Sequence, residues 1–161
     1  MIGGAPLAYE AMEGELGQLV ERSWQSFGMR VLELRAENLL PLVTGLRDRF
    51  DFTLFLDVTA VDYPERSPRF DVVYHFSSHR HNQRIRLKLP VPAGRPVVPT
   101  LTGHYGSARY MEREVHDMYG IEFAGNEDLR PILLYEGFVG HPLRKDYPIE
   151  REQPMVPYRA G

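Results

Sequence analysis

The chain of 161 residues contains no cysteine. Within this chain, that absence excludes cysteine-ligated iron–sulfur clusters, thiolate zinc sites, disulfides and cysteine nucleophiles. No apolar run approaches the roughly 20 residues that a membrane-spanning helix needs, so we expect no span. The first residues lack a basic region followed by an apolar core, so we expect no signal peptide. The composition is compatible with a cytoplasmic location.

A strong excess of one charge is also missing. The formal net charge is −3, so no overall positive field would attract nucleic acid. No glycine-rich loop precedes a helix as phosphate binding requires, and no nucleophile-elbow pattern surrounds a serine. The hydrophobic fraction of 43% is enough for one packed domain. We therefore expect one domain without catalytic, cofactor-binding or metal-binding residues.

Three histidines are the basis for an alternative function, that of a metal-dependent enzyme. His75, His79 and His81 flank a turn and could bind a metal through their imidazole nitrogens. No carboxylate stands at a ligand-like spacing, and Arg80 and Arg84 would repel a cation. We favour a polar hairpin with surface histidines. A stand-alone metal-dependent enzyme that uses these three histidines stays open as the alternative.

Apolar residues at helical spacing predict three helices. The first covers residues 10–27, with Trp24 on its buried face. Asn38 is expected to cap the second, which runs to about Phe50. Ser107 caps the third, which ends at Gly120. Its expected buried face carries Ala108, Met111, Val115 and Met118.

Alternation with a period of two predicts four strands. They cover residues 30–35, 52–62, 70–76 and 84–89, and the proline-rich residues 90–100 are expected to be a connector. In the second strand we expect one shared face for Phe52, Leu54, Leu56, Val58 and Ala60. This order of elements predicts a two-layer α+β domain, with helices on one face of a mixed, mostly antiparallel sheet.

The part of the chain after Gly120 has no repeating period, although it contains many apolar residues. Such a segment cannot bury its own side chains and needs another surface, either its own domain or a partner. We predict that residues 1–120 form the α+β core. Residues 121–161 would form an extended C-terminal arm that docks on a partner, within the same structural unit.

The arm contains the stretch Gly140-His141-Pro142-Leu143-Arg144-Lys145-Asp146-Tyr147-Pro148. One interpretation is an ordinary charged loop. The other is a segment docked on another protein, with Arg144 and Lys145 reaching acidic or carbonyl acceptors. The residues alone leave both interpretations open.

These residues resemble the motifs of the C-type subunit of proton-pumping NADH–quinone oxidoreductase, respiratory complex I of the bacterial type. The chain supplies Glu112-Arg113-Glu114, Asp117-Met118-Tyr119-Gly120-Ile121, Asp128-Leu129-Arg130 and residues 140–148 in the order of that family. Upstream, residues 57–63 resemble the family's strand end. Asn126-Glu127 replaces a usual His-Pro, and Pro131 a usual Arg. The resemblance covers roughly residues 30–150.

The resemblance implies a non-catalytic structural subunit in the hydrophilic arm of an enzyme that belongs to electron transport. That complex, an NADH dehydrogenase, passes electrons from NADH through FMN and iron–sulfur clusters to quinone and couples this to proton translocation. The cofactors would lie in partner subunits.

The same resemblance implies the partners. The chain would contact the D-type subunit, the large subunit that helps form the quinone site, and neighbouring iron–sulfur subunits. It would be a peripheral protein on the cytoplasmic side of the plasma membrane. A closer alternative is the equivalent subunit of a membrane-bound hydrogenase or of another quinone- or ferredoxin-linked dehydrogenase.

Within this interpretation, eight residues are the predicted partner-binding set. The polar anchors are Arg113, Asp117, His141, Arg144, Lys145 and Asp146, and the apolar anchors are Leu143 and Tyr147.

Overall fold

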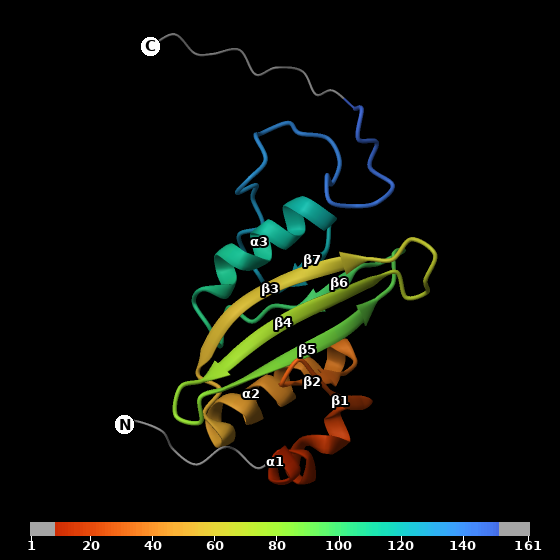
Figure 1. The fold of residues 1–161 in the computed structure, drawn as a ribbon. Helices are drawn as coiled ribbons and strands as arrows, with labels where there is room; N and C mark the ends of the chain where they lie inside the picture. The colour runs from red at the N-terminus through yellow and green to blue at the C-terminus, as the bar shows by residue number, and fades with distance from the viewer. Residues whose placement is uncertain (1–8, 152–161) are drawn as a thin grey trace.

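The computed structural model describes residues 9–151. Its helices are α1 (Tyr9–Leu16), α2 (Leu39–Phe50) and α3 (Ala108–Tyr119), with short 3-10 turns at Gly17–Leu19 and Ala36–Asn38. Its strands are β1 (Arg22–Ser26), β2 (Met29–Glu33), β3 (Leu54–Asp62), β4 (Phe70–Ser78), β5 (Gln83–Val91), β6 (Val97–Pro99) and β7 (Glu122–Ala124). Figure 1 shows α1 and α2 at one end of the molecule and α3 with the C-terminal segment at the other.

The main sheet has the strand order β1-β2-β5-β4-β3. Only the β2–β5 pair is parallel, and the other three pairs are antiparallel hairpins. The predicted fold class, a mixed and mostly antiparallel sheet with helices on one face, is confirmed. A second, two-stranded parallel sheet joins β6 to β7. Residues 97–99, expected to be part of a connector, therefore form a short strand.

One hydrophobic cluster fills the space between the main sheet and the helices. The predicted alternation of β4 and β5 is confirmed, because Val72, Tyr74 and Phe76 and the facing residues Ile85, Leu87 and Leu89 are all buried in this cluster. Among the described residues, no element covers the opposite face of the sheet. We call it the open face. Residues there include Trp24, Val31, Val61, Val73, His75, Arg86 and Lys88.

The prediction of one helix over residues 10–27 is wrong beyond residue 19. Residues 22–26 instead form β1, which pairs with β2 through a turn at Phe27 and Gly28. Both turn residues have positive φ, and Gly28 adopts φ +75° without steric cost. Trp24 therefore lies opposite Val31 in the sheet rather than on the buried face of a helix.

The predicted face of β3 is also partly wrong. The pairing of β3 with β4 shifts register between Phe55 and Asp57, which is a β-bulge. A bulge inserts one residue and reverses the side-chain alternation before it. Leu54 and Leu56 are consequently 47% and 38% exposed, while Phe55 enters the core in their place.

The two predicted N-caps hold their positions without making the expected bonds. Asn38 and Ser107 precede α2 and α3, but neither side chain caps its helix. The Asn38 amide instead donates to the Leu19 carbonyl at 3.1 Å. In α3, Ala108 and Val115 are buried as predicted, whereas Met111 and Met118 are only partly buried. The acidic Glu112 and Asp117 are buried in addition, which makes this helix the centre of the site below.

Two buried tyrosines allow a test of the core. The Tyr74 hydroxyl is buried without a hydrogen-bond partner in the described chain, whereas the Tyr105 hydroxyl donates to the Phe52 carbonyl at 2.8 Å. We expect Tyr74→Phe to leave the free energy of unfolding unchanged or to raise it by about 1–2 kcal/mol, since an unsatisfied hydroxyl is removed. The control Tyr105→Phe should lower it by about 1 kcal/mol. Urea unfolding followed by circular dichroism measures both. A clear loss of stability in Tyr74→Phe would contradict the expectation.

Candidate functional site

The candidate site is the C-terminal segment, residues 125–151, where it folds over α3. An α-helix leaves its last four backbone carbonyls without partners inside the helix. In α3 each of these carbonyls receives a hydrogen bond from residues that follow the helix. The donors are Gly120 N to His116 O (2.8 Å), His141 Nδ1 to Asp117 O (2.9 Å), Leu143 N to Met118 O (3.1 Å) and Arg144 Nε to Tyr119 O (2.5 Å). Residues 141–144 thus supply hydrogen-bond donors to three of the four carbonyls at the C-terminal end of α3.

Gly120 makes this close approach possible. It ends α3 in the left-handed conformation, with φ +69°. A Cβ atom at this position would lie 2.7 Å from Arg144 Nη2 and closer still to the His141 imidazole. The predicted role of Gly120 as a C-cap is confirmed. The same glycine also provides the surface on which the arm packs.

Two side chains of α3 hold the turn at residues 130–134. The Asp117 Oδ2 atom accepts hydrogen bonds from the backbone N–H groups of Ile132 (2.8 Å), Leu133 (3.0 Å) and Leu134 (3.3 Å). Arg113 donates to the carbonyls of Arg130 and Pro131, both at 2.8 Å. A carboxylate thus binds N–H groups and a guanidinium binds carbonyls, which satisfies both kinds of backbone group in the turn.

A second polar cluster joins the arm to the ends of β3 and β4. The buried Asp62 carboxylate forms a bidentate pair with Arg69, at 2.6 and 2.8 Å, and accepts a hydrogen bond from Lys145 N at 2.7 Å. Arg69 also pairs with Asp146 at 2.8 Å. The hydrogen bonds from Arg69 hold the pKa of the Asp62 carboxyl below its usual value, against the opposing effect of burial. Arg144 lies over the Phe70 ring at 5.3 Å.

Glu112 holds the loops near the other end of α3. Its fully buried carboxylate accepts from Thr100 Oγ1 (2.6 Å), Leu101 N (2.7 Å) and Asn126 Nδ2 (2.9 Å). Burial raises the pKa of the Glu112 carboxyl, and these hydrogen bonds counteract only part of the rise. Asn126, which departs from the family pattern, therefore supplies a donor to a buried carboxylate.

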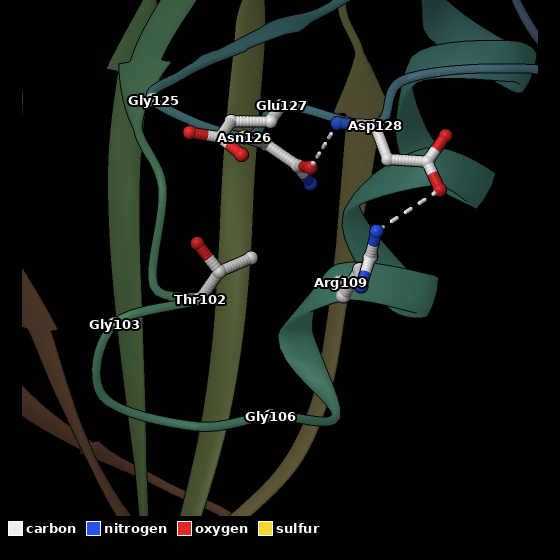
Figure 2. Close-up of a pocket in the computed structure, with 8 residues that line it drawn as sticks. All are labelled: Thr102, Gly103, Gly106, Arg109, Gly125, Asn126, Glu127 and Asp128. Atoms are coloured by element: carbon white, nitrogen blue, oxygen red, sulfur yellow. Dashed lines mark hydrogen bonds and ion pairs between the residues drawn. The ribbon is translucent and has the colours of Figure 1, made fainter.

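A depression of about 460 Å³ lies beside the loop that contains Asn126, next to the start of α3. Figure 2 shows Arg109 directed toward Asp128, at 3.5 Å, and the Asn126 side chain turned to the Asp128 backbone, at 3.0 Å. The remaining lining residues are Thr102, Gly103, Gly106, Gly125 and Glu127. Arg109 and Asp128 in this depression already pair with each other. Among the lining residues of this depression, no nucleophile is paired with a base.

In the structure, the predicted partner-binding residues mostly make contacts within the chain. The contacts above use the side chains of Arg113, Asp117, His141, Arg144 and Asp146 and the backbone of Leu143 and Lys145. Tyr147 stacks on Phe138, with ring centroids 6.1 Å apart. Whether these eight residues also touch a partner stays a prediction, as does the division of the chain at residue 120.

Several exposed side chains of the segment are large and apolar, although charged residues such as Arg130 and Asp146 are exposed too. We call six of them the apolar arm surface: Ile132, Leu133, Tyr135, Val139, Leu143 and Ile149. Leu133 is 61% exposed and Val139 57%. The sequence prediction includes only Leu143 of this set as a site residue. In the sequence, the other five residues appear only as apolar residues in a segment without periodicity. Ile121 and Phe123 look the same in the sequence but are buried in the core, so the sequence does not distinguish exposed from buried apolar residues here.

The three histidines of the metal-enzyme alternative form no metal site. Residues 9–151 contain no group of three or more His, Asp or Glu residues that could hold a metal ion. His75 lies on the open face, where its Nε2 atom accepts a hydrogen bond from Arg86 Nε at 2.8 Å. Within the same residues, no helix is long and apolar enough to cross a membrane.

Comparisons with known proteins identify the family of the chain. The family described as "Respiratory-chain NADH dehydrogenase, 30 Kd subunit" matches residues 32–153. The C-type subunit of NADH-quinone oxidoreductase from Sinorhizobium medicae (strain WSM419) is 50% identical over 135 residues, which are 83% of this chain and 67% of that protein. A C-type subunit from Rhizobium meliloti (strain 1021) is 47% identical with the same coverage. The chain thus spans about two thirds of the length of these relatives.

Two solved structures share the fold. The trypsin-resistant fragment (1-134) of Nqo5 has a TM-score of 0.68 at 28% identity and covers 75% of this chain and 98% of the fragment. A chain of the membrane-bound sulfane sulfur reductase, an archaeal respiratory membrane complex, has a TM-score of 0.75 at 22% identity and covers 88% and 86%. The second likeness shows the fold alone.

The sequence relatives decide between the alternatives stated above. They confirm the interpretation as a subunit of NADH–quinone oxidoreductase over a related complex or a metal enzyme. The chain belongs to the family of the 30 kDa subunit of respiratory-chain NADH dehydrogenase.

Proposed function

We propose that this chain is a structural subunit that attaches to the D-type subunit of NADH–quinone oxidoreductase through the apolar arm surface. One observation carries the proposal. Backbone groups of the segment are bonded within the chain, to α3 and to Asp62, while six large apolar side chains of the segment are exposed. A segment that is held in place and exposes several large apolar side chains among charged ones fits an interface whose partner covers the apolar groups.

The chemistry of the complex would then lie outside this chain. The described residues include buried carboxylates, but each is bound by donors of its own chain. FMN and the iron–sulfur clusters would belong to partner subunits, and the chain would lie on the cytoplasmic side of the membrane. Its contribution would be to hold neighbouring subunits together, including the iron–sulfur subunits next to the D-type subunit.

The polar residues predicted as direct anchors take a different role in this proposal. Arg113, Asp117 and Arg144 would act as positioning residues that keep the apolar arm surface in one conformation. An interface segment that is already ordered loses less conformational entropy on binding.

Charge substitutions on the apolar arm surface test the proposal. In the double variant Leu133→Asp/Val139→Asp, two carboxylates would have to be buried against an apolar partner surface. We expect the amount of full-length chain that co-purifies with the tagged D-type subunit to fall at least about tenfold, which corresponds to about 1.4 kcal/mol or more. The fold should persist, because both side chains are exposed.

The matched control is Phe27→Asp. Phe27 is a fully exposed apolar residue in the turn between β1 and β2, and Figure 1 shows these strands at the other end of the molecule from the arm. This control should co-purify like the unchanged chain. Equal co-purification of the double variant would overturn the proposal. Point substitutions are preferable to truncation before Gly140, because truncation also removes the donors that complete α3.

A further inference from the structure

The open face of the main sheet contains a depression that lies outside the proposed arm interface. Across the strands, Trp24, Val31, Arg86 and His75 occupy neighbouring positions. Together with Val61 and Val73 they line a depression of about 340 Å³. Val61 and Tyr63 at its border are 37% and 38% exposed, so the depression has an apolar rim.

One cation in this depression lacks a neutralising partner. Arg86 is half-buried, and its Nε atom donates to His75 Nε2 at 2.8 Å. Within residues 9–151 no carboxylate lies within ion-pair distance of the Arg86 guanidinium. The neighbouring cation, Lys88, differs because it pairs with Asp71 at 2.8 Å, and Asp71 also pairs with Arg66.

The partner of Arg86 is an uncharged ring. Burial lowers the pKa of His75, and the positive charges of Arg86 and Arg84 lower it further, while Asp57 acts in the opposite direction. The imidazole therefore accepts the hydrogen bond in its neutral form near pH 7 and leaves the guanidinium charge uncompensated. A partly desolvated guanidinium is a strong site for a planar carboxylate.

We propose that the open face is a second protein-docking surface, which binds an Asp or Glu side chain flanked by apolar residues in a segment of another subunit. Arg86 binds the carboxylate, and Trp24, Val61 and Tyr63 contact the apolar residues on either side.

The charges of this face favour that occupant over two others. A second copy of this chain would place Arg86 close to its own symmetry mate in a two-fold contact, and like charges at an interface are unfavourable. A polyanionic surface, such as nucleic acid or an acidic membrane, is bound by many cations together. Here Lys88 and Arg66 both pair with Asp71 inside the chain instead.

Photo-crosslinking in the assembled complex tests the inference. The full chain carries p-benzoylphenylalanine at position 61, and the crosslinked peptides of the purified complex are identified by mass spectrometry. We expect a crosslink to another subunit, in a segment that contains Asp or Glu between apolar residues. The same probe at exposed Arg49, on the helical side of the molecule, should not reach that segment.

Substitution of Arg86 tests whether the crosslink depends on the positive charge of this side chain. Arg86→Glu should reduce its yield by about tenfold or more, whereas Arg86→Lys, which keeps the charge but loses the planar fork, should reduce it less. Arg86→Gln, which keeps the size and removes the charge, provides the same test if Arg86→Glu fails to assemble. A crosslink to a second copy or only to lipid, no crosslink, or an unchanged yield in Arg86→Gln would overturn the proposal.

Discussion

Replacing Asp117 by alanine is expected to release residues 130–134 from α3 and to lower the free energy of unfolding by about 2–4 kcal/mol. The reason is the number of hydrogen bonds that depend on one oxygen. Asp117 Oδ2 accepts from the N–H groups of Ile132, Leu133 and Leu134, and the Asp117 carboxylate is buried. Without it these groups must turn to water, and the apolar arm surface loses its fixed conformation.

Amide hydrogen exchange of the full chain measures this effect where it arises. Residues 132–134 should exchange much faster in Asp117→Ala, while the central strand β4 should keep its protection. Asp117→Asn should be intermediate, because its amide oxygen still accepts but carries no charge. Glu114→Ala is the control, since Glu114 is a carboxylate three residues earlier on the same helix and is exposed. Normal protection of residues 132–134 in Asp117→Ala would show that the carboxylate does not hold the turn.

This dependence on one buried acid also shows the limits of reading the sequence. The motif marks Asp117 as important, but the sequence prediction directs its side chain toward a partner. Periodicity identifies a residue's face on a helix, not the segment that packs against that face. The bond between His141 and the Asp117 carbonyl spans 24 positions of an aperiodic segment, and no local rule indicates such a pairing.

The main sheet is predictable where local pattern and tertiary packing agree. Strand β5 alternates throughout, and in β4 the residues Val72, Tyr74 and Phe76 face the core, although Asp71 and Val73 on the other face are buried as well. In β3, the bulge between Phe55 and Asp57 exchanges the faces of the preceding residues. In β1, the spacing of apolar residues up to Trp24 mimics a helix, while the pairing with β2 makes a strand. Both errors come from strand pairing, which depends on residues outside the segment.

Residues whose role depends on contacts with distant strands are missed in the sequence. In the sequence, Arg86 is one of three alternating basic residues of β5, with Arg84 and Lys88. Its significance depends on the neighbours that β2 and β4 supply, Val31 and His75, and on the pairing of Lys88 with Asp71. A charge becomes informative when its partners are known, and those partners come from distant parts of the chain.

The second large effect is expected at Asp62. Asp62→Ala should lower the free energy of unfolding by about 3–5 kcal/mol, because Arg69 loses its bidentate partner while its side chain stays mostly buried. The guanidiniums of Arg69 and Arg144 lie 5.1 and 5.3 Å from the Phe70 ring centroid, so two cations would share one ring with less negative charge nearby. Lys145 N would also lose its acceptor, which frees the arm.

The matched control removes the other carboxylate of Arg69. Asp146 pairs with the same guanidinium but is 58% exposed, so Asp146→Ala should cost only about 0–1 kcal/mol. Urea unfolding of the three chains at pH 7 measures the difference. Equal losses in both variants would mean that burial of Asp62 does not determine its contribution. Recovery of stability in Asp62→Ala/Arg69→Leu would show that the unpaired Arg69 guanidinium causes the loss in free energy of unfolding.

The dependence on pH provides an independent check of the same pair. Arg69 lowers the pKa of Asp62 in the folded chain, so the folded state binds this proton less readily than the unfolded state does. The stabilisation is therefore complete above the ordinary carboxyl pKa of about 4 and is lost as the pH falls through the lower, folded value. Asp62→Asn has no such proton to bind, so its stability should fall less steeply below about pH 4 than that of the unchanged chain. Parallel acid profiles for the two chains would show that the Asp62 carboxylate is not the group that Arg69 stabilises.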